Sequence, residues 1–539
     1  MAVSRFVATL FFFISCLGVS YSQKDKELPA EQVDVIKSFE VKLLDVSKLK
    51  LDPSFPVIDT TTVKQEYTPI NTKVNVNYDA PALKPLAMPV EPLQKAYNGY
   101  AKAGYGIPSS PFLEASYHYN MAELDLIAKF KHHSANFRKI ENQRFSDNDI
   151  TLDGTYYFPQ GFALNGKTNY SFDKNYFYGY DHSDTSFTAD QAKQRFRTFD
   201  FDINFFNGPR NEGDINYLGA LQIYRHTDNF DAGETGMLFK IQGQKWFADK
   251  YLANLELGTD LTKYSGLIDH SLNLFYLKPN FTYRNDIFKI KAGINLVSQQ
   301  DEFNIFPDIS TSINVFGTKF TIFGGWEGGV QKNTFRQMTT FNPYLISNLD
   351  TLVATSYNRY YGGVKGIYRI FNYELQGGFK AVKNLALYLN DDTDTRRFRP
   401  LFDDANIVYF KASAGATITK GLTFLGTISQ SVFDMKQERG AWHLPSLEGS
   451  AGLAYKTLSD KLSVKADVFF ADGAPYKGTD GSKKRTNPLV DVNIGGDFWI
   501  LENVGAFLQV NNLLNIKYQR WNNYPNYGIN ILGGVVARF

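Results

Sequence analysis

The sequence predicts an all-β protein, a transmembrane antiparallel up-and-down β-barrel of about 22 strands. Three observations lead to this prediction. Long segments alternate between apolar and polar residues, short turns alternate with long polar loops, and aromatic residues crowd the ends of the alternating segments. Together they indicate strands that contact lipid on one face and water or polar protein on the other.

The alternating segments are the main evidence for membrane-spanning strands. In Phe199–Phe205, Phe and Ile alternate with Asp and Asn, and in Phe288–Asn295 Phe, Ile and Ala alternate with Lys, Gly and Asn. A soluble β-sandwich also alternates, but its strands are mostly about 5–6 residues long. Several segments here continue for about ten residues, which is the length that a tilted membrane-spanning strand needs.

The last alternating segment runs to the end of the chain. Between Asn526 and Phe539, Ile, Gly, Val and Ala recur at every second position. Such a strand must find a partner, because an unpaired strand edge invites association with other chains. Pairing of the last strand with the first would close a barrel and remove the edge.

The connections between these segments give a second signal. We predict short connections at Asn120–Glu123, Pro159–Gly161, Phe247–Lys250, Arg284–Asp286, Gly317–Lys319, Ile370–Asn372, Thr419–Gly421, Leu458–Lys461 and Leu501–Asn503, with Asn207–Asp214 on the same side by parity alone. Longer polar loops separate them, at His133–Asp149, Tyr180–Gln194, Gly328–Arg359, Asn390–Asp404, Phe433–Pro445, Ala471–Asn487 and Asn511–Tyr527. This alternation is typical of a Gram-negative outer-membrane barrel with its short turns and its N-terminus in the periplasm.

Composition excludes several classes of protein. The net charge of +2 argues against a nucleic-acid binder, so no nucleic-acid partner is predicted.

Residues 1–22 are predicted to be a secretory signal peptide, with Arg5, the apolar stretch Val7–Val19 and cleavage before Gln23; a lipoprotein acylation box at Phe13–Cys16 is the alternative. Cys16 is the only cysteine, so the predicted mature chain has neither disulfides nor thiolate ligands.

Residues 23–95 differ from the rest of the chain. Seven of the twenty prolines lie between Pro53 and Pro92, which indicates an extended segment with few ladder hydrogen bonds. Two interpretations stay open: a flexible linker, or an ordered strap inside or beneath the barrel, on the periplasmic or luminal side. The barrel itself is predicted for residues 96–539.

The C-terminal fifty residues also carry a family resemblance. Its features are Gly496-Asp497-Phe498, the strand Ala506–Val510, Asn511–Asn515, Lys517-Tyr518 and Gly533–Phe539. This segment resembles the end of TonB-dependent outer-membrane receptors. The resemblance implies a barrel of about 22 strands and a role for Phe539 in the signal that the barrel-assembly machinery reads. Such receptors have a plug domain larger than the segment 23–95, so the chain is similar to plugless receptor-like barrels of the Bacteroidota.

Two functions follow from the resemblance. The first is a transporter that admits or gates an unidentified substrate, and the alternative is a non-transporting accessory subunit of a larger outer-membrane assembly or secretion complex. A barrel of this size, roughly 40 Å across, must be occluded. We expect the occluding element to be the segment 23–95, the Gly328–Arg359 loop folded inward, or another outer-membrane or periplasmic subunit.

We predict no enzyme, no cofactor and no metal site. The seven histidines form no recognisable catalytic arrangement. His132-His133 is more simply a solvated pair than a metal site, and Asp147, Asp149 and Asp153 fail the EF-hand spacing.

Basic residues in the predicted outward loops suggest a lipid contact. They form two groups, Arg396, Arg397 and Arg399, and Lys483, Lys484 and Arg485. Guanidinium and ammonium groups bind phosphate through charge-assisted hydrogen bonds, so we predict contact with lipopolysaccharide phosphates beside outer-membrane lipid. The alternative for both groups is a plain solvated loop.

Overall fold

The computed structural model describes residues 97–208, 213–299, 302–456 and 461–539. All of these residues belong to one compact unit, Leu83–Phe539. The predicted signal peptide and the segment 23–95 therefore lie outside the described residues.

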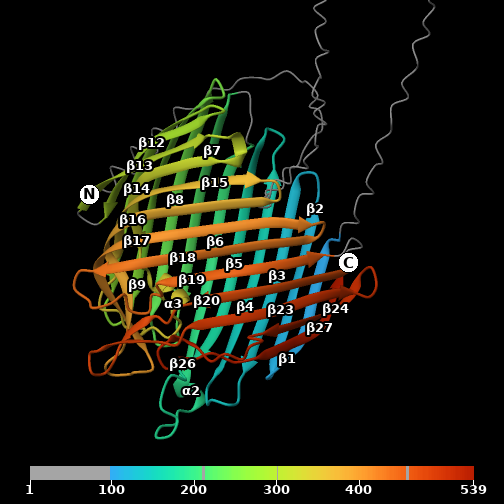
Figure 1. Cartoon of the computed structure of the whole chain (residues 1–539), viewed down its shortest axis with the longest axis vertical. Coiled ribbons are helices and arrows are strands. Elements are labelled where there is room, and N and C mark those ends of the chain that lie inside the picture. The colour runs from blue at the N-terminus through green and yellow to red at the C-terminus, as the bar shows by residue number, and fades with distance from the viewer. Residues whose placement is uncertain (1–96, 209–212, 300–301, 457–460) are drawn as a thin grey trace, which may run out of the picture. The chain divides into compact units, whose positions relative to one another are not determined.

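The described residues form a closed antiparallel β-barrel (Figure 1). One sheet contains 23 of their strands; β10 has two residues and pairs only with β9, so 22 strands make up the wall. The wall strands are β1 (Gly99–Ile107), β2 (Ser110–Asn120), β3 (Leu124–Asn136), β4 (Arg144–Tyr157), β5 (Phe162–Tyr176), β6 (Lys193–Asn207), β7 (Ile215–Thr227), β8 (Gly233–Phe247), β9 (Tyr251–Ser265), β11 (Leu274–Arg284), β12 (Phe288–Gln299), β13 (Glu302–Asn314), β14 (Thr321–Lys332), β15 (Ala354–Tyr368), β16 (Phe371–Asn390), β17 (Phe398–Thr419), β18 (Leu422–Met435), β19 (Leu447–Lys456), β20 (Leu462–Ala471), β23 (Leu489–Trp499), β24 (Val504–Asn511) and β27 (Asn530–Arg538).

The remaining elements lie in the connections. They are α2 (Ala189–Ala192), β10 (His270–Ser271), η1 (Gly317–Lys319), α3 (Phe335–Phe341), the paired strands β21 (Pro475–Lys477) and β22 (Lys483–Arg485), and the paired strands β25 (Gln519–Trp521) and β26 (Tyr524–Pro525). None of the helices among the described residues is long and apolar enough to cross a bilayer.

The first and last strands close the barrel. β1 pairs with β27 in antiparallel register, from Tyr100 opposite Arg538 to Ile107 opposite Ile531. At the end of this seam, the backbones of Gly99 and Phe539 exchange two hydrogen bonds of 2.7 and 3.0 Å. The predicted pairing of the final strand with the first is confirmed.

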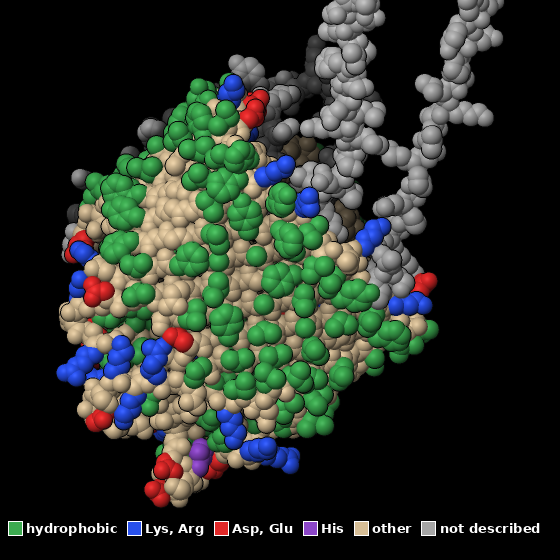
Figure 2. Space-filling view, viewed as in Figure 1, with side chains coloured by type: hydrophobic (Ala, Val, Ile, Leu, Met, Phe, Trp, Pro, Cys, Tyr) green, Lys and Arg blue, Asp and Glu red, His purple; other side chains and the backbone are tan. Residues whose placement is uncertain are grey.

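The wall strands alternate between an outward apolar face and an inward face, which is polar on strands such as β6, whereas on β27 it carries the buried Leu532 and Val536. On β6 the side chains of Phe199 and Phe201 are 47% and 37% exposed, whereas Asp200 between them is buried at 6%. Figure 2 shows apolar side chains spread over the outside of the wall, with most charged groups near its margins. The alternation read from the sequence therefore separates a lipid-facing surface from a polar lumen.

The connections alternate as predicted, with two corrections. Short turns such as 369–370 and 420–421 lie on one side, and long connections such as 177–192, 333–353 and 472–488 lie on the other. The loop predicted at Asn390–Asp404 is only 391–397, because β16 and β17 extend until Asn390 pairs with Phe398. The loop predicted at His133–Asp149 was drawn too long: β3 and β4 extend until Asn136 pairs with Arg144, and the loop is only 137–143. The polar residues that suggested a loop lie on the luminal face of these strands or at the rim of the barrel, where polar side chains are compatible with a strand.

Candidate functional site

The connection between β14 and β15, residues 333–353, folds into the barrel. We call it the inner loop. It contains α3, and its contacts are with inward-facing groups of the wall, including Asp200 of β6, Glu234 of β8 and Tyr264 of β9. The Gly328–Arg359 loop, one of the three candidates expected from the sequence to occlude the barrel, thus folds inward, over residues 333–353.

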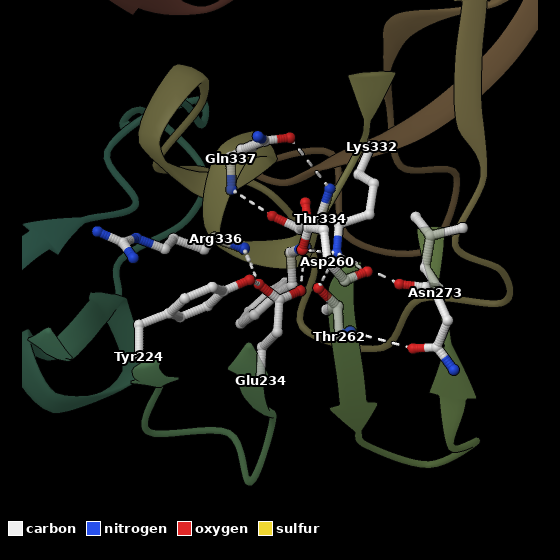
Figure 3. A network of polar contacts seen from close by, with 11 residues as sticks. Tyr224, Glu234, Asp260, Thr262, Asn273, Lys332, Thr334, Arg336 and Gln337 are labelled. Carbon is white, nitrogen blue, oxygen red and sulfur yellow. Dashed lines mark hydrogen bonds and ion pairs between the residues drawn. The ribbon is translucent and has the colours of Figure 1, made fainter. Parts of the chain in front are cut away.

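A buried lysine holds the start of the inner loop. The Lys332 ammonium, on a side chain that is 4% exposed, donates to the backbone carbonyls of Asp260 at 3.1 Å and Leu272 at 3.3 Å. It also contacts the Asp260 carboxylate and the Thr262 hydroxyl (Figure 3). A buried charge is tolerated only with such partners, so these contacts fix where the inner loop leaves β14.

The N-terminal end of α3 meets a wall carboxylate. Glu234 is fully buried and accepts hydrogen bonds from the Phe335 N–H at 2.6 Å, the Arg336 N–H at 3.3 Å and the Tyr224 hydroxyl at 2.8 Å. Thr334 caps the helix and forms a reciprocal capping box with Gln337 (Figure 3). First-turn N–H groups have no partner within a helix, so the carboxylate and the cap together satisfy them.

Side chains of α3 bind the neighbouring strands. The Arg336 guanidinium donates two hydrogen bonds to the Asp200 carboxylate, at 2.6 and 3.0 Å, and lies 4.6 Å from the centre of the Tyr224 ring. Thr339 lies 3.1 Å from Nε2 of His226. Bidentate arginine–carboxylate pairs are directional as well as strong, so they orient the helix against β6 and β7.

An apolar cluster fills the space between the inner loop and the other connections. The inner loop contributes Phe335, Met338, Leu345, Leu349 and Leu352, which are buried with Phe177, Phe196, Tyr264, Leu272, Phe398, Trp521 and Tyr524. The rings of Tyr344 and Tyr524 stack at 3.7 Å with an interplanar angle of 20°. Burial raises the pKa of both hydroxyls well above the ordinary tyrosine value.

These contacts bring three sectors of the wall together. The Ile346 N–H donates to the Phe398 carbonyl at 2.8 Å, and the Phe398 N–H donates to the Tyr344 carbonyl at 2.9 Å, at the start of β17. Tyr524 belongs to the β25–β26 hairpin, which lies between β24 and β27. Groups from β6–β9, β17 and the β24–β27 connection thus meet around the inner loop, which bridges the loop end of the barrel.

A neutral histidine joins two of the connections. His443 is buried; Nδ1 lies 2.8 Å from the Tyr388 carbonyl, and Nε2 is 3.3 Å from the Asn522 N–H. Burial lowers the pKa of His443 to about 4. The imidazole is therefore uncharged near neutral pH, with Nδ1 as donor and Nε2 as acceptor.

The predicted basic residues lie in two separate loops and are partly neutralised. Arg396 and Arg397 pair with Asp394 at 2.8 and 3.1 Å, and Arg399 pairs with Asp392 at 2.7 Å. In the second loop Lys484 pairs with Asp480 at 3.6 Å and Arg485 pairs with Asp472, whereas Lys483 donates to the backbone carbonyl of Arg439 at 3.3 Å. Their contact with lipopolysaccharide stays a prediction.

The other singled-out residues are part of the wall. His132 bonds Asn148 at 2.6 Å, and the ring of His133 packs edge-on against Phe145 at 5.1 Å. The described residues include no group of three or more His, Cys, Asp or Glu side chains placed to hold a metal ion. The ring of Phe539 stacks on Tyr117 at 6.5 Å, and its role in assembly stays a prediction.

Sequence reasoning named the Gly328–Arg359 loop as one of three candidates for an inward-folded element, but it did not identify the residues that hold this loop. Glu234, Asp260 and Lys332 lie at inward positions of ordinary alternating strands, so nothing local distinguishes them from other luminal charges. The capping box at Thr334 and Gln337 was a usable signal, since this spacing marks the start of a helix.

Comparisons with known proteins agree with this architecture. No protein-family model matches the sequence, and no curated protein does. Similar solved structures include the FrpB iron transporter from Neisseria meningitidis (F5-1 variant), with a TM-score of 0.66 and 10% identity over 83% of both chains. They also include the ferric yersiniabactin uptake receptor FyuA from Yersinia pestis, with a TM-score of 0.64 and 10% identity over 83% of this chain and 80% of that one. A third is the ferric-catecholate import receptor Fiu from E. coli, with a TM-score of 0.62 and 10% identity over 82% of both chains.

The matches define the class of fold. The chain has the closed 22-strand barrel of TonB-dependent receptors, which confirms the predicted fold class and the resemblance of the C-terminal strands. This is a fold of outer-membrane proteins, and the apolar outer wall in Figure 2 agrees with that location.

Proposed function

We propose that the protein is an outer-membrane transport barrel and that the inner loop is its gate. The observation that supports this most is the way the inner loop is held. α3 lies against β6–β8 through Glu234, Asp200 and His226, all of them groups that can exchange one hydrogen-bonding partner for another. Such contacts hold the loop in one position. When the loop moves, water or a solute can replace it as the hydrogen-bonding partner of these wall groups.

The known neighbours support transport as the class of function. The FrpB, FyuA and Fiu structures carry names that describe an iron transporter, an uptake receptor and an import receptor. This chain shares their barrel and has a polar luminal face, which is what passage of a hydrophilic solute requires. We extend to this chain only the class of function, which is transport of a solute. We do not extend to it the cargo of these neighbours.

Orientation is part of the proposal. We place the long loops on the cell exterior and the short turns in the periplasm, as is usual for outer-membrane barrels. An epitope tag inserted in 472–488 should then bind antibody on intact cells, whereas a tag at 420–421 should bind only after the outer membrane is broken. The reverse pattern would contradict the orientation without affecting the fold.

The gate can be tested in cells. Replacing residues 335–349 with a short glycine linker removes α3 and most of what the inner loop contributes to the apolar cluster. We expect such cells to become sensitive to a large hydrophilic antibiotic that intact outer membranes exclude, while cells with the unmodified chain stay resistant. Resistance equal to that of unmodified cells, with the variant present at normal levels as a heat-modifiable barrel, would exclude the inner loop as the barrier.

Co-purification tests the accessory role expected as the alternative. Extraction of the native protein followed by size separation should yield the barrel without a fixed set of stoichiometric partners if transport is its function. A stable complex of constant composition, together with unchanged solute uptake in a strain that lacks the protein, would favour the accessory role.

A further inference from the structure

A pocket of about 410 Å³ lies at the loop end of β18. We call it the rim pocket. Its walls are the last residues of β18 around Val432, the connection 436–446 with Arg439, and strand β22 with Lys483 and Arg485. The inner loop does not line it, so the rim pocket is separate from the proposed gate.

The rim pocket borders the lipid-facing surface. Val432 is 60% exposed, and its partner in the register, Val408 of β17, is 57% exposed. Phe410, two residues further along the same face, is 48% exposed. These positions alternate with the inward-facing Tyr409, so they form an apolar strip on the outside of the wall that leads to the rim pocket.

Cations without acidic partners line the rim pocket. In the described part of the chain, no carboxylate lies within 4.0 Å of the Arg439 guanidinium or the Lys483 ammonium, and Arg439 is exposed. Two carboxylates also line the rim pocket: that of Asp434 lies 3.6 Å from the Lys436 ammonium, and that of Glu438 accepts from the Trp442 indole at 2.8 Å. Arg485 is paired with Asp472. Figure 2 shows Lys and Arg side chains at the lower left of this face, with some Asp and Glu side chains among them, at the margin of the apolar wall.

We propose that the rim pocket binds lipopolysaccharide, with a phosphate on Arg439 and Lys483 and an acyl chain along Val408, Phe410 and Val432. An amphiphile with an anionic head and an apolar tail matches a pocket in which Arg439 and Lys483 have no acidic partner and which adjoins an apolar strip. Guanidinium and ammonium groups hold phosphate oxygens through charge-assisted hydrogen bonds. We assign the phosphate and the acyl chain to lipopolysaccharide because the rim pocket is on the loop side of the barrel, which faces the cell exterior in the proposed orientation. The inference rests on that orientation and not on transport.

The proposal refines the two basic groups found in the sequence. Lys483 lines the rim pocket and has no acidic partner, whereas Lys484 is paired with Asp480 and lies outside the set of lining residues. Arg396, Arg397 and Arg399 belong to a different connection and are paired with Asp394 or Asp392. Arg439, which the sequence did not single out, is the second cation of the rim pocket.

Native mass spectrometry of the detergent-extracted full chain tests the proposal. We compare the unmodified protein, the double variant Arg439→Gln and Lys483→Gln, and a control with Lys319→Gln and Lys420→Gln, two exposed lysines in the opposite turns. Each charge-assisted bond lost from a lipid phosphate should weaken binding, so we expect lipopolysaccharide bound per barrel to fall about tenfold or more in the double variant. The control should retain it.

Three outcomes would overturn the proposal. The first is equal lipopolysaccharide retention by the double variant and the control. The second is a loss of bound phospholipid with lipopolysaccharide unchanged, which would assign the pocket to another lipid. The third is a loss in Arg439→Lys as large as in the double variant, with all variants heat-modifiable, because a lysine keeps the charge. None of these results depends on antibiotic sensitivity, so failure of the rim pocket and failure of the gate are distinguishable.

Discussion

At the scale of single residues, buried polar groups decide where the connections lie. Glu234, Lys332 and His443 are all buried, and each has partners that suit its charge state: N–H donors for the carboxylate, oxygen acceptors for the ammonium, and one donor and one acceptor for the neutral imidazole. Removing one partner of such a group costs more than the intact contact contributes, since the other partner stays buried without a bond.

Loss of Glu234 should open α3 locally. In Glu234→Ala, the N–H groups of Phe335 and Arg336 lose their acceptor. At about 1–3 kcal/mol for each unsatisfied group, we expect hydrogen exchange in α3 to speed up about a hundredfold or more. Glu256→Ala is the matched control, because Glu256 is a wall carboxylate paired with Lys278. Unchanged exchange of the α3 amides in Glu234→Ala would show that this carboxylate does not hold the inner loop.

Acid should loosen the contact between the 436–446 connection and the β25–β26 hairpin. The pKa of His443 is about 4 in the fold and near 6.5 when the loop opens, so the open form binds more protons between these values. Stability is therefore complete above about pH 6.5 and falls as the pH drops toward 4. At pH 5 we expect protection factors in these segments about thirtyfold lower than at pH 7.5, or about 2 kcal/mol.

The control for this prediction removes the titrating group. His443 has φ +60°, a conformation that asparagine tolerates better than most residues, and an asparagine amide can donate to the Tyr388 carbonyl. In His443→Asn the pH dependence of protection should disappear. Equal acid sensitivity in both proteins would assign it to another group.

At the scale of elements, the strands were predictable and the folded connections were not. Alternation in Phe199–Phe205 reports burial directly, because lipid and lumen require opposite residue types on the two faces. The His133–Asp149 region was wrongly predicted to be a loop. Its residues are polar both at inward positions and at the rim of the barrel, so the two faces of these strands differ less in polarity than elsewhere. The path of the inner loop depends on partners from distant strands, such as Glu234 and Phe398, which no local pattern contains.

The seam between β1 and β27 gives a prediction at this scale. Ala103 and Val535 lie directly opposite each other, and the predicted mature chain has no cysteine of its own. Opposed positions of an antiparallel pair lie close enough for a disulfide. We therefore expect Ala103→Cys with Val535→Cys to form an intramolecular crosslink under mild oxidation, seen as a gel shift that a reductant reverses. Ala101→Cys with Val535→Cys, offset by two residues, should crosslink much less; equal yields would contradict the register.

At the scale of the whole barrel, the described residues combine a membrane wall with a long connection that folds inside it. Twenty-two wall strands enclose a polar lumen, and the inner loop joins β6–β9, β17 and the β24–β27 connection across its loop end. The inner loop has polar contacts on one side and an apolar cluster on the other. Water can solvate the groups of the polar side, but it cannot solvate those of the apolar side. We infer that opening begins at α3.

Single-channel conductance in planar bilayers tests this account most directly. The purified full chain should show little or no steady conductance in potassium chloride. The variant in which a glycine linker replaces residues 335–349 should show large, stable openings, and Glu234→Ala should show brief ones. Equal conductance in all three proteins, with each inserted as a heat-modifiable barrel, would contradict the claim that the inner loop closes the barrel.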